Sequence, residues 1–202
     1  MYLIRGQHNL GLFKLRFPDI KLCGTIGNFD GLHLGHQAIL NKVKKNAEQN
    51  DAKTIVFFTE PHAKEYFAKI RDKNIMPPPR ICPWREKVKL LKQNKIDFVF
   101  FLKFNNSLRT MPPEKFISEI LESINLITFT VGDDFRFGEN RKGDSNLLKT
   151  WGVKNNVVVE NTETIVHLGE RVSSTRIRNE LMNNNFEISE ELLGRPYTFT
   201  GK

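Results

Sequence analysis

Short apolar runs alternate with amphipathic segments along most of the chain. The apolar runs predict strands over residues 20–29, 54–58, 97–102, 127–131 and 157–159. Apolar residues at helical spacing predict helices over residues 35–49, 84–92, 113–123, 145–151, 174–182 and 188–193. This alternation of strands and helices is typical of an α/β fold with a mostly parallel sheet.

Polar and glycine-rich segments follow the ends of three predicted strands. Residues 27–36 follow the first strand, residues 60–62 the second, and residues 132–143 the fourth. In a parallel sheet, ligands bind beyond the carboxyl ends of the strands, near the point where the strand order reverses. The sequence therefore predicts one site, assembled at one edge of the sheet.

The first of these segments has the features of an anion site. Gly27, Asp30 and Gly31 form a turn between strand and helix, and His33 and His36 begin the helix. Backbone N–H groups and a helix N-terminus attract anions, and imidazole donates hydrogen bonds to phosphate oxygens. Two readings compete: a pair of capping histidines without a ligand, and a zinc site, which no cysteine or second carboxylate supports. The pattern favours phosphate.

A run of hydroxyl residues, Ser173, Ser174 and Thr175, leads into the helix predicted from residue 174. One hydroxyl is enough to cap a helix, and that reading explains only one of the three. The other two, with Arg178 one turn further on, suit the β- and γ-phosphates of a triphosphate.

The segment 132–144 carries two aromatic residues, Phe135 and Phe137, beside two adjacent aspartates. One reading is a solvated loop anchored by the two rings. The other is a pocket wall for a flat ring system, with Arg136 or Arg141 supplying charge for a phosphate. The carboxylates could order the loop or hold Mg²⁺ through water.

A lone histidine, His62, follows the second predicted strand, and its position leaves a structural and a functional role open. The sequence contains no Walker lysine motif, no Gly-x-Ser-x-Gly element and no Gly-x-Gly-x-x-Gly element. These absences argue against a P-loop kinase, a serine hydrolase and a dinucleotide-dependent dehydrogenase.

The composition is that of a globular protein with a basic surface. Lys+Arg 31 and Asp+Glu 23 give a net charge of +8 over 202 residues. The positive residues are dispersed, so we do not expect a nucleic acid partner, although the charge would steer polyphosphates toward a cleft. No apolar run approaches the roughly 18 residues of a membrane span. Without a signal peptide pattern, and with two distant cysteines, we expect a cytoplasmic protein with free thiols.

Four motifs in order resemble one known family. They are Ile-Gly-Asn-Phe-Asp-Gly-Leu-His-Leu-Gly-His at residues 26–36, Gly-Asp-Asp-Phe-Arg-Phe-Gly at 132–138, Ser-Ser-Thr-Arg-Ile-Arg at 173–178 and Leu-Gly-Arg-Pro-Tyr at 193–197. Together they resemble the adenylyltransferase (FAD synthetase) part of the bacterial bifunctional riboflavin kinase/FAD synthetases, in the nucleotidyltransferase superfamily. The resemblance covers about residues 20–200 and implies a Rossmann-like nucleotidyltransferase fold with flanking helices. The family's Pro-His-Pro is Pro61, His62, Ala63 here.

The resemblance implies a reaction in which FMN and ATP give FAD and pyrophosphate. The FMN phosphate would attack the α-phosphorus of ATP in line, without a covalent enzyme intermediate. Mg²⁺ would accompany the ATP phosphates, no protein residue is assigned as its ligand, and no tightly bound prosthetic group is required.

The resemblance also implies which residues serve the reaction. His33, His36 and Asn28 would act on the transferring phosphate. The ATP site would comprise Gly27, Asn28, Phe29, Asp30, His33, Gly35, His36, Ser173, Ser174, Thr175 and Arg178. The FMN site would comprise His62, Asp134, Phe135, Phe137 and Arg141.

Two further expectations concern organisation. Residues 1–190 would form the adenylyltransferase domain, and residues 191–202 would lead toward a riboflavin kinase module whose motifs do not occur before Lys202. The proline-rich residues 69–83 are expected to form a long surface loop. The competing functions are another nucleotidyltransferase, acting on a pantetheine, nicotinamide or glycerol phosphate, and a non-catalytic flavin-binding or RNA-binding module.

Overall fold

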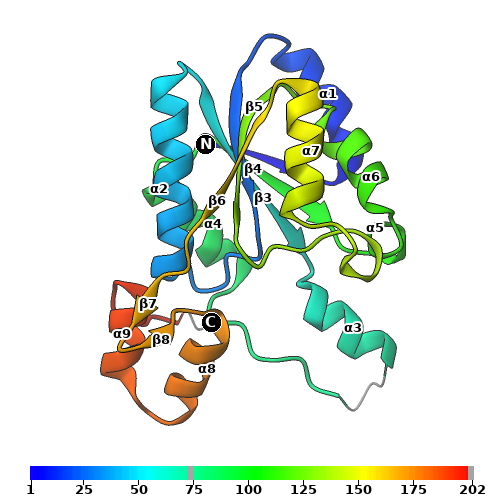
Figure 1. The fold of residues 1–202 in the computed structure, drawn as a ribbon. Helices are drawn as coiled ribbons and strands as arrows, with labels where there is room; N and C mark the ends of the chain where they lie inside the picture. Colours follow the sequence, from blue (N-terminus) through cyan, green and yellow to red (C-terminus); the bar gives the residue numbers. More distant parts are fainter. Residues whose placement is uncertain (72–74, 200–202) are drawn as a thin grey trace.

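A computed structural model describes residues 1–71 and 75–199, and its centre is a parallel sheet (Figure 1). The strand order in this six-stranded sheet is β1 (Tyr2–Arg5), β4 (Phe98–Lys103), β3 (Lys53–Glu60), β2 (Leu22–Ile26), β5 (Leu126–Gly132) and β6 (Val158–Thr162). Every neighbouring pair is parallel. The predicted α/β fold with a mostly parallel sheet is thus confirmed.

Helices cover both faces of the sheet, and others lie beyond its carboxyl edge. The helices are α1 (Leu10–Arg16), α2 (Leu34–Gln49), α3 (Ala63–Arg71), α4 (Trp84–Gln93), α5 (Asn106–Arg109), α6 (Pro113–Phe116), α7 (Ser145–Asn155), α8 (Ser174–Met182) and α9 (Phe186–Leu193). Figure 1 shows α2 and α4 on one face, and α1, α6 and α7 on the other. Each face has its own buried apolar cluster, so the sheet is sandwiched between two layers.

Several elements differ from the sequence prediction. The first predicted strand ends at Ile26, not at residue 29, because the chain turns there. The helix predicted over 113–123 is α6 followed by a π-helix, Ile117–Leu121. Strand β1 and helices α1, α3 and α5 were not predicted. The edge strand β1 is mostly exposed and therefore shows no buried apolar run.

The loop predicted over 69–83 is wrong at its beginning, because residues 69–71 belong to α3. Residues 72–74 lie outside the described part of the chain. From residue 75 to residue 83 the chain forms no helix or strand. The prediction was based on prolines that lie only in the second half of the segment, and the amphipathic end of α3 was overlooked.

The order of the strands reverses at β2. From β2 the chain adds β3 and β4 on one side, and it then crosses to add β5 and β6 on the other. Thr25 in β2 is opposite Thr130 in β5, so the carboxyl ends of these two strands lie side by side. This is the position where parallel α/β sheets bind ligands.

A small C-terminal unit lies beyond the carboxyl edge of the sheet. It contains the antiparallel hairpin of β7 (Val166–His167) and β8 (Glu170–Arg171), with α8 and α9 (Figure 1). Its apolar cluster includes Leu192 and Leu193, so the domain boundary predicted at residue 190 falls inside the packed helix α9. That division of the chain stays a prediction. Among the described residues, no helix has the length and apolar character needed to cross a lipid bilayer.

Candidate active site

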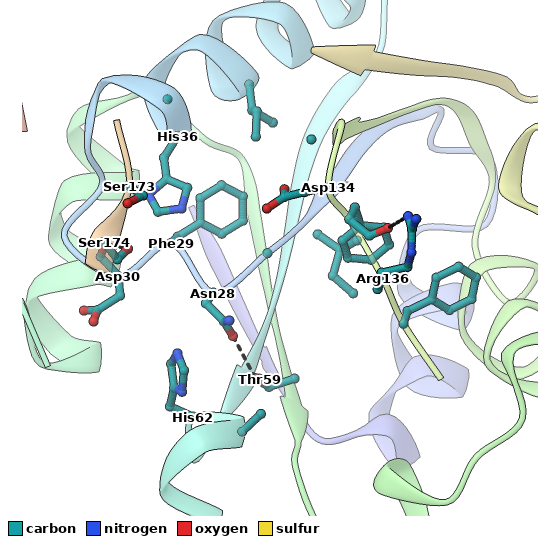
Figure 2. A pocket seen from close by; sticks show the side chains of 18 of the residues that line it. Asn28, Phe29, Asp30, His36, Thr59, His62, Asp134, Arg136, Ser173 and Ser174 are labelled. Carbon is teal, nitrogen blue, oxygen red and sulfur yellow. Dashed lines mark hydrogen bonds between the residues drawn. The ribbon is translucent and has the colours of Figure 1, made fainter. Parts of the chain in front are cut away.

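A cavity of about 810 Å³ opens at the carboxyl edge of the sheet, above the ends of β2 and β5. All the predicted site residues line it: Gly27, Asn28, Phe29, Asp30, His33, Gly35, His36, His62, Asp134, Phe135, Phe137, Arg141, Ser173, Ser174, Thr175 and Arg178. Figure 2 shows how side chains from distant parts of the chain converge around Asn28 and Phe29. The structure thus brings these residues together, while their individual roles in binding stay predictions.

The turn after β2, here called the phosphate turn (residues 27–33), has an unusual backbone. Phe29, Gly31 and Leu32 all have positive φ angles, of 48°, 80° and 45°. Only glycine adopts this region readily, so two of these three residues carry local strain. Both strained side chains are fully buried, and this packing holds the turn in place.

Carbonyl groups of the phosphate turn are bound by side chains from α4, from α8, from the segment after α9 and from α2 itself. The contacts are Lys87 Nζ to Asn28 O at 2.5 Å, Ser174 Oγ to Asp30 O at 2.9 Å, Arg195 Nη2 to Gly31 O at 2.8 Å and Gln37 Nε2 to Leu32 O at 3.0 Å. These four contacts fix the direction in which the peptide groups of the turn point, and a peptide whose carbonyl points one way directs its N–H the other way.

Asp30, predicted to contact ATP, is a buried carboxylate that organises the turn. It accepts hydrogen bonds from the backbone N–H of Ile81 at 3.1 Å and of Cys82 at 3.2 Å, and it forms an ion pair with Arg178. Arg178 also donates to the carbonyl oxygens of Pro79, at 2.7 Å, and of Ser174. Both charged groups are therefore engaged within the protein, and a direct contact of either with ATP stays a prediction.

His33 is the N-cap residue of α2. Its Nδ1 accepts a hydrogen bond from the backbone N–H of His36 at 3.4 Å, so the ring proton of the neutral imidazole lies on Nε2. Gly35 allows this arrangement, because a Cβ there would lie 3.2 Å from the His33 ring. The sequence predicts His33 at the start of the helix, and the structure shows that its side chain also caps the first turn of α2.

The two imidazoles lie face to face, with ring centroids 3.7 Å apart and planes inclined by 20°. Burial, with a smaller contribution from the Arg171 guanidinium, lowers the pKa of His33 to about 4. Burial and the neighbouring His33 also lower the pKa of His36 well below its usual value. Both rings are therefore neutral at pH 7, and each can offer an N–H rather than a full positive charge.

The hydroxyl cluster divides into three different environments. Ser173 caps α8 by accepting from the backbone N–H of Arg176 at 3.2 Å, and Ser174 donates to the phosphate turn. Thr175 is exposed in the first turn of α8. The N-termini of α2 and α8 thus both open toward the cavity, which gives it two positive helix ends.

Aromatic and aliphatic side chains form one wall of the cavity. Phe135 and Phe137 stack with centroids 5.6 Å apart, and Phe137 is largely buried against Phe116. The sequence missed three members of this wall, Phe104, Leu108 and Phe116. Phe104 directly follows β4, so its position after a strand was the available signal.

Charged groups face this wall across the cavity. Arg171, also missed, pairs with Asp134 at 2.8 Å and lies 3.8 Å from Asp133. His62 begins the α3 region, where its Nδ1 accepts from the Lys64 N–H at 3.1 Å and burial lowers its pKa. Figure 2 shows Asp134 and His62 approaching Asn28 from different sides of the cavity.

The zinc interpretation of the two histidines gains no support. No group of three or more His, Cys, Asp or Glu side chains converges as a metal site in residues 1–71 and 75–199. The nearest carboxylate in the sequence, Asp30, is committed to Arg178.

Comparison with known proteins identifies the family. The model of the FAD synthetase family matches residues 19–176. Over the whole chain, the sequence is 37% identical to a protein of Buchnera aphidicola, 36% identical to one of Escherichia coli and 37% identical to one of Pseudomonas fluorescens. All three carry the name bifunctional riboflavin kinase/FMN adenylyltransferase, and the chain spans 62% of the length of each.

A solved structure supports the fold. A Streptococcus pneumoniae protein titled a macrolide-efflux protein superposes with a TM-score of 0.77 over 96% of this chain and 70% of its own, at 23% identity. At this identity, the likeness concerns the fold alone. The family match and the full-length sequence identities go further: this chain belongs to the FAD synthetase family.

Proposed function

We propose that this protein transfers AMP from ATP to the phosphate of FMN, giving FAD and pyrophosphate. The observation that carries the proposal is the composition of one cavity. Two neutral imidazoles and two helix N-termini lie at one end of it, and an aromatic wall lies at the other. A triphosphate and a flat ring system are the ligands that this combination suits.

In the proposed reaction, an oxygen of the FMN phosphate attacks the α-phosphorus of ATP. The bond from that phosphorus to the bridging oxygen breaks, and pyrophosphate leaves with the electron pair. The attacking group is already an anion, so no protein nucleophile or general base is required. Catalysis depends on alignment of the two substrates and on donors directed at the charge that develops.

The histidines supply those donors. His33 carries its proton on Nε2, because its Nδ1 is used as the helix cap. His36 is stacked directly on it. We assign both rings, with Asn28, to the non-bridging oxygens of the α-phosphate. Neutral donors suit this task, because they stabilise the added charge of the transition state without holding the product as tightly as a full cation does.

The hydroxyl cluster and the start of α8 are assigned to the leaving pyrophosphate. Thr175 is exposed in the first helical turn, and Ser173 and Ser174 shape the entry of the helix. Arg171 lines the same cavity. Its long cationic side chain now pairs with the exposed carboxylates of Asp133 and Asp134. These groups would hold the β- and γ-phosphates.

A divalent metal enters this scheme as part of the ATP substrate, and we propose Mg²⁺. Asp133 and Asp134 are exposed carboxylates that line the cavity and suit the hydrated shell of the metal. Bound to the phosphates, the metal would neutralise charge on the leaving group.

The flavin is assigned to the aromatic wall. Phe135 and Phe137 offer an apolar surface, continued by Phe104 and Phe116. His62, Asp134 and Arg141 also line the cavity and are proposed to contact the polar parts of FMN. Riboflavin kinase activity appears only in the names of the longer relatives, and we do not propose it for residues 1–202.

The direct test is to incubate the purified protein with ATP, Mg²⁺ and FMN and to separate the flavins by chromatography. Formation of FAD, with an equal amount of pyrophosphate, is expected. Unchanged FMN, together with adenylylation of nicotinamide mononucleotide or a pantetheine phosphate, would instead support another nucleotidyltransferase. Binding of FMN without turnover would support a non-catalytic flavin-binding module.

A further inference from the structure

A buried lysine lies directly behind the phosphate turn. Lys87, on α4, is only 4% exposed, although α4 is otherwise a surface helix with exposed lysines such as Lys89. Its Nζ donates to the carbonyl oxygen of Asn28 at 2.5 Å and lies 4.5 Å from the centre of the Phe58 ring. The sequence interpretation gave this residue no role.

The ammonium group of Lys87 has no carboxylate partner. Within the described residues, its contacts are one carbonyl oxygen and one aromatic ring, and it takes part in no ion pair. The buried carboxylate of the turn, Asp30, is paired with Arg178 instead. A buried cation without a counterion is costly, so an apolar residue of similar length would serve packing better.

The position of the charge links it to the site. Burial is the main cause that lowers the pKa of His36 and of His62, and the field of Lys87 adds a smaller lowering to each. Both histidines line the cavity. The residue bound by Lys87, Asn28, also lines the cavity. Burial lowers the pKa of Lys87, and Asp30 and Glu60, which are paired with arginines, favour its charged form only through their fields. An anion in the phosphate turn would add a further counterion.

We propose that Lys87 is a positioning residue of the phosphate site, which places a fixed positive charge behind the phosphate turn and draws polyphosphate into it. This proposal rests on the proposed function of the cavity, but it concerns affinity for the phosphate chain alone. Lys87 acts through Asn28 and through its field, without touching the ligand. A purely structural lysine would instead contribute mainly to packing of α4.

The experiment compares Lys87→Met, Lys87→Gln and the control Lys89→Met. Met keeps the length of the apolar stem, and Gln keeps a donor for the Asn28 carbonyl, but both remove the charge. Lys89 is exposed on the same helix, so its variant controls for net charge. Affinity for inorganic tripolyphosphate is measured by calorimetry at low and physiological salt, and Tm is measured on the same samples.

We expect both Lys87 variants to bind tripolyphosphate about tenfold or more weakly, consistent with loss of one close charge. Their Tm should stay at or above that of the wild type, because an uncompensated buried charge has been removed. Lys89→Met should match the wild type. Wild-type affinity in either Lys87 variant would overturn the proposal, and so would a lower Tm in both, which would assign Lys87 to packing.

Failure of this proposal is distinguishable from failure of the proposed function. Tripolyphosphate binding requires neither FMN nor turnover. If the wild type made FAD and the Lys87 variants bound tripolyphosphate normally, only the role of Lys87 would be lost. If the Lys87 variants bound tripolyphosphate more weakly but the wild type made no FAD, the proposed role of Lys87 would be retained and the proposed reaction would need revision.

Discussion

Asp30 and Arg178 are 148 residues apart in the sequence, and their side chains form a buried ion pair beneath the phosphate turn. The same carboxylate binds two backbone N–H groups of residues 81 and 82, so three separate parts of the chain meet at one side chain. Arg178 joins α8 to the segment before α4 through its contact with Pro79. The pair therefore holds the C-terminal unit against the turn.

Removal of one partner of this pair should be much more harmful than removal of both. Arg178→Ala leaves the Asp30 carboxylate buried without its cation, and we expect it to lower the free energy of unfolding by about 3–5 kcal/mol. The double variant Asp30→Asn/Arg178→Ala should regain part of that loss. Urea unfolding of the single and double variants measures the coupling. Additive losses would contradict a direct role of the pair.

His36→Ala should lower kcat for FAD synthesis by about 10²–10³-fold, the range for loss of one transition-state donor. The ring is not part of the main apolar clusters, so the fold should persist. Steady-state kinetics and circular dichroism measure the two effects. His8→Ala, at an exposed histidine that does not line the cavity, is the control. A kcat equal to that of the control would remove His36 from the reaction.

Stability should depend on pH through His33. The unfolded chain binds a proton on this residue below about pH 6.5, whereas the folded protein does so only below about pH 4. The free energy of unfolding should therefore fall as the pH drops from 6.5 to 4, by on the order of 3 kcal/mol for this residue at 1.36 kcal/mol per pKa unit. His33→Asn keeps a cap acceptor but cannot titrate.

Denaturant unfolding of the wild type and His33→Asn at several pH values isolates the contribution of His33, because other titrating groups are common to both proteins. The wild type should lose more stability toward pH 4 than the variant. Parallel curves would show that the imidazole is not kept neutral by its environment.

Phe104→Ala should weaken FMN more than ATP. Phe104 packs edge to face against Tyr66, with centroids 5.3 Å apart, and is one of the aromatic residues that line the cavity. Loss of one aromatic contact should raise the KM for FMN about 3- to 10-fold. The KM for ATP should change by less than twofold if the two ligands occupy the assigned ends. Equal changes in both constants would argue against this division of the cavity.

The most accurately predicted elements are those whose burial is evident from their own local sequence. Strands β3 and β4 are buried on both faces and therefore read as continuous apolar runs. The location of the site was also predictable from the sequence. The polar and glycine-rich segments follow strands, and parallel strands bring their carboxyl ends to one edge of the sheet. Elements with mixed exposure, such as β1 and α3, gave no comparable signal.

The contacts that shape the site could not be predicted in this way. Lys87 meets Asn28 across 59 residues, and Arg195 meets Gly31 across 164 residues. Both contacts depend on tertiary packing, which no local pattern encodes. One signal was present, however: Lys87 lies one turn before Leu91 on the buried face of α4, and a charged residue on an apolar face is unusual.

The most direct test of the proposed reaction follows the α-phosphate of ATP. The protein is incubated with FMN and ATP radiolabelled in the α-phosphate, and flavins, nucleotides and denatured protein are separated. We predict that the label passes into FAD, that pyrophosphate carries none, and that the protein retains none. Label bound to the denatured protein, or unlabelled flavin after the ATP has been consumed, would contradict direct in-line transfer to FMN.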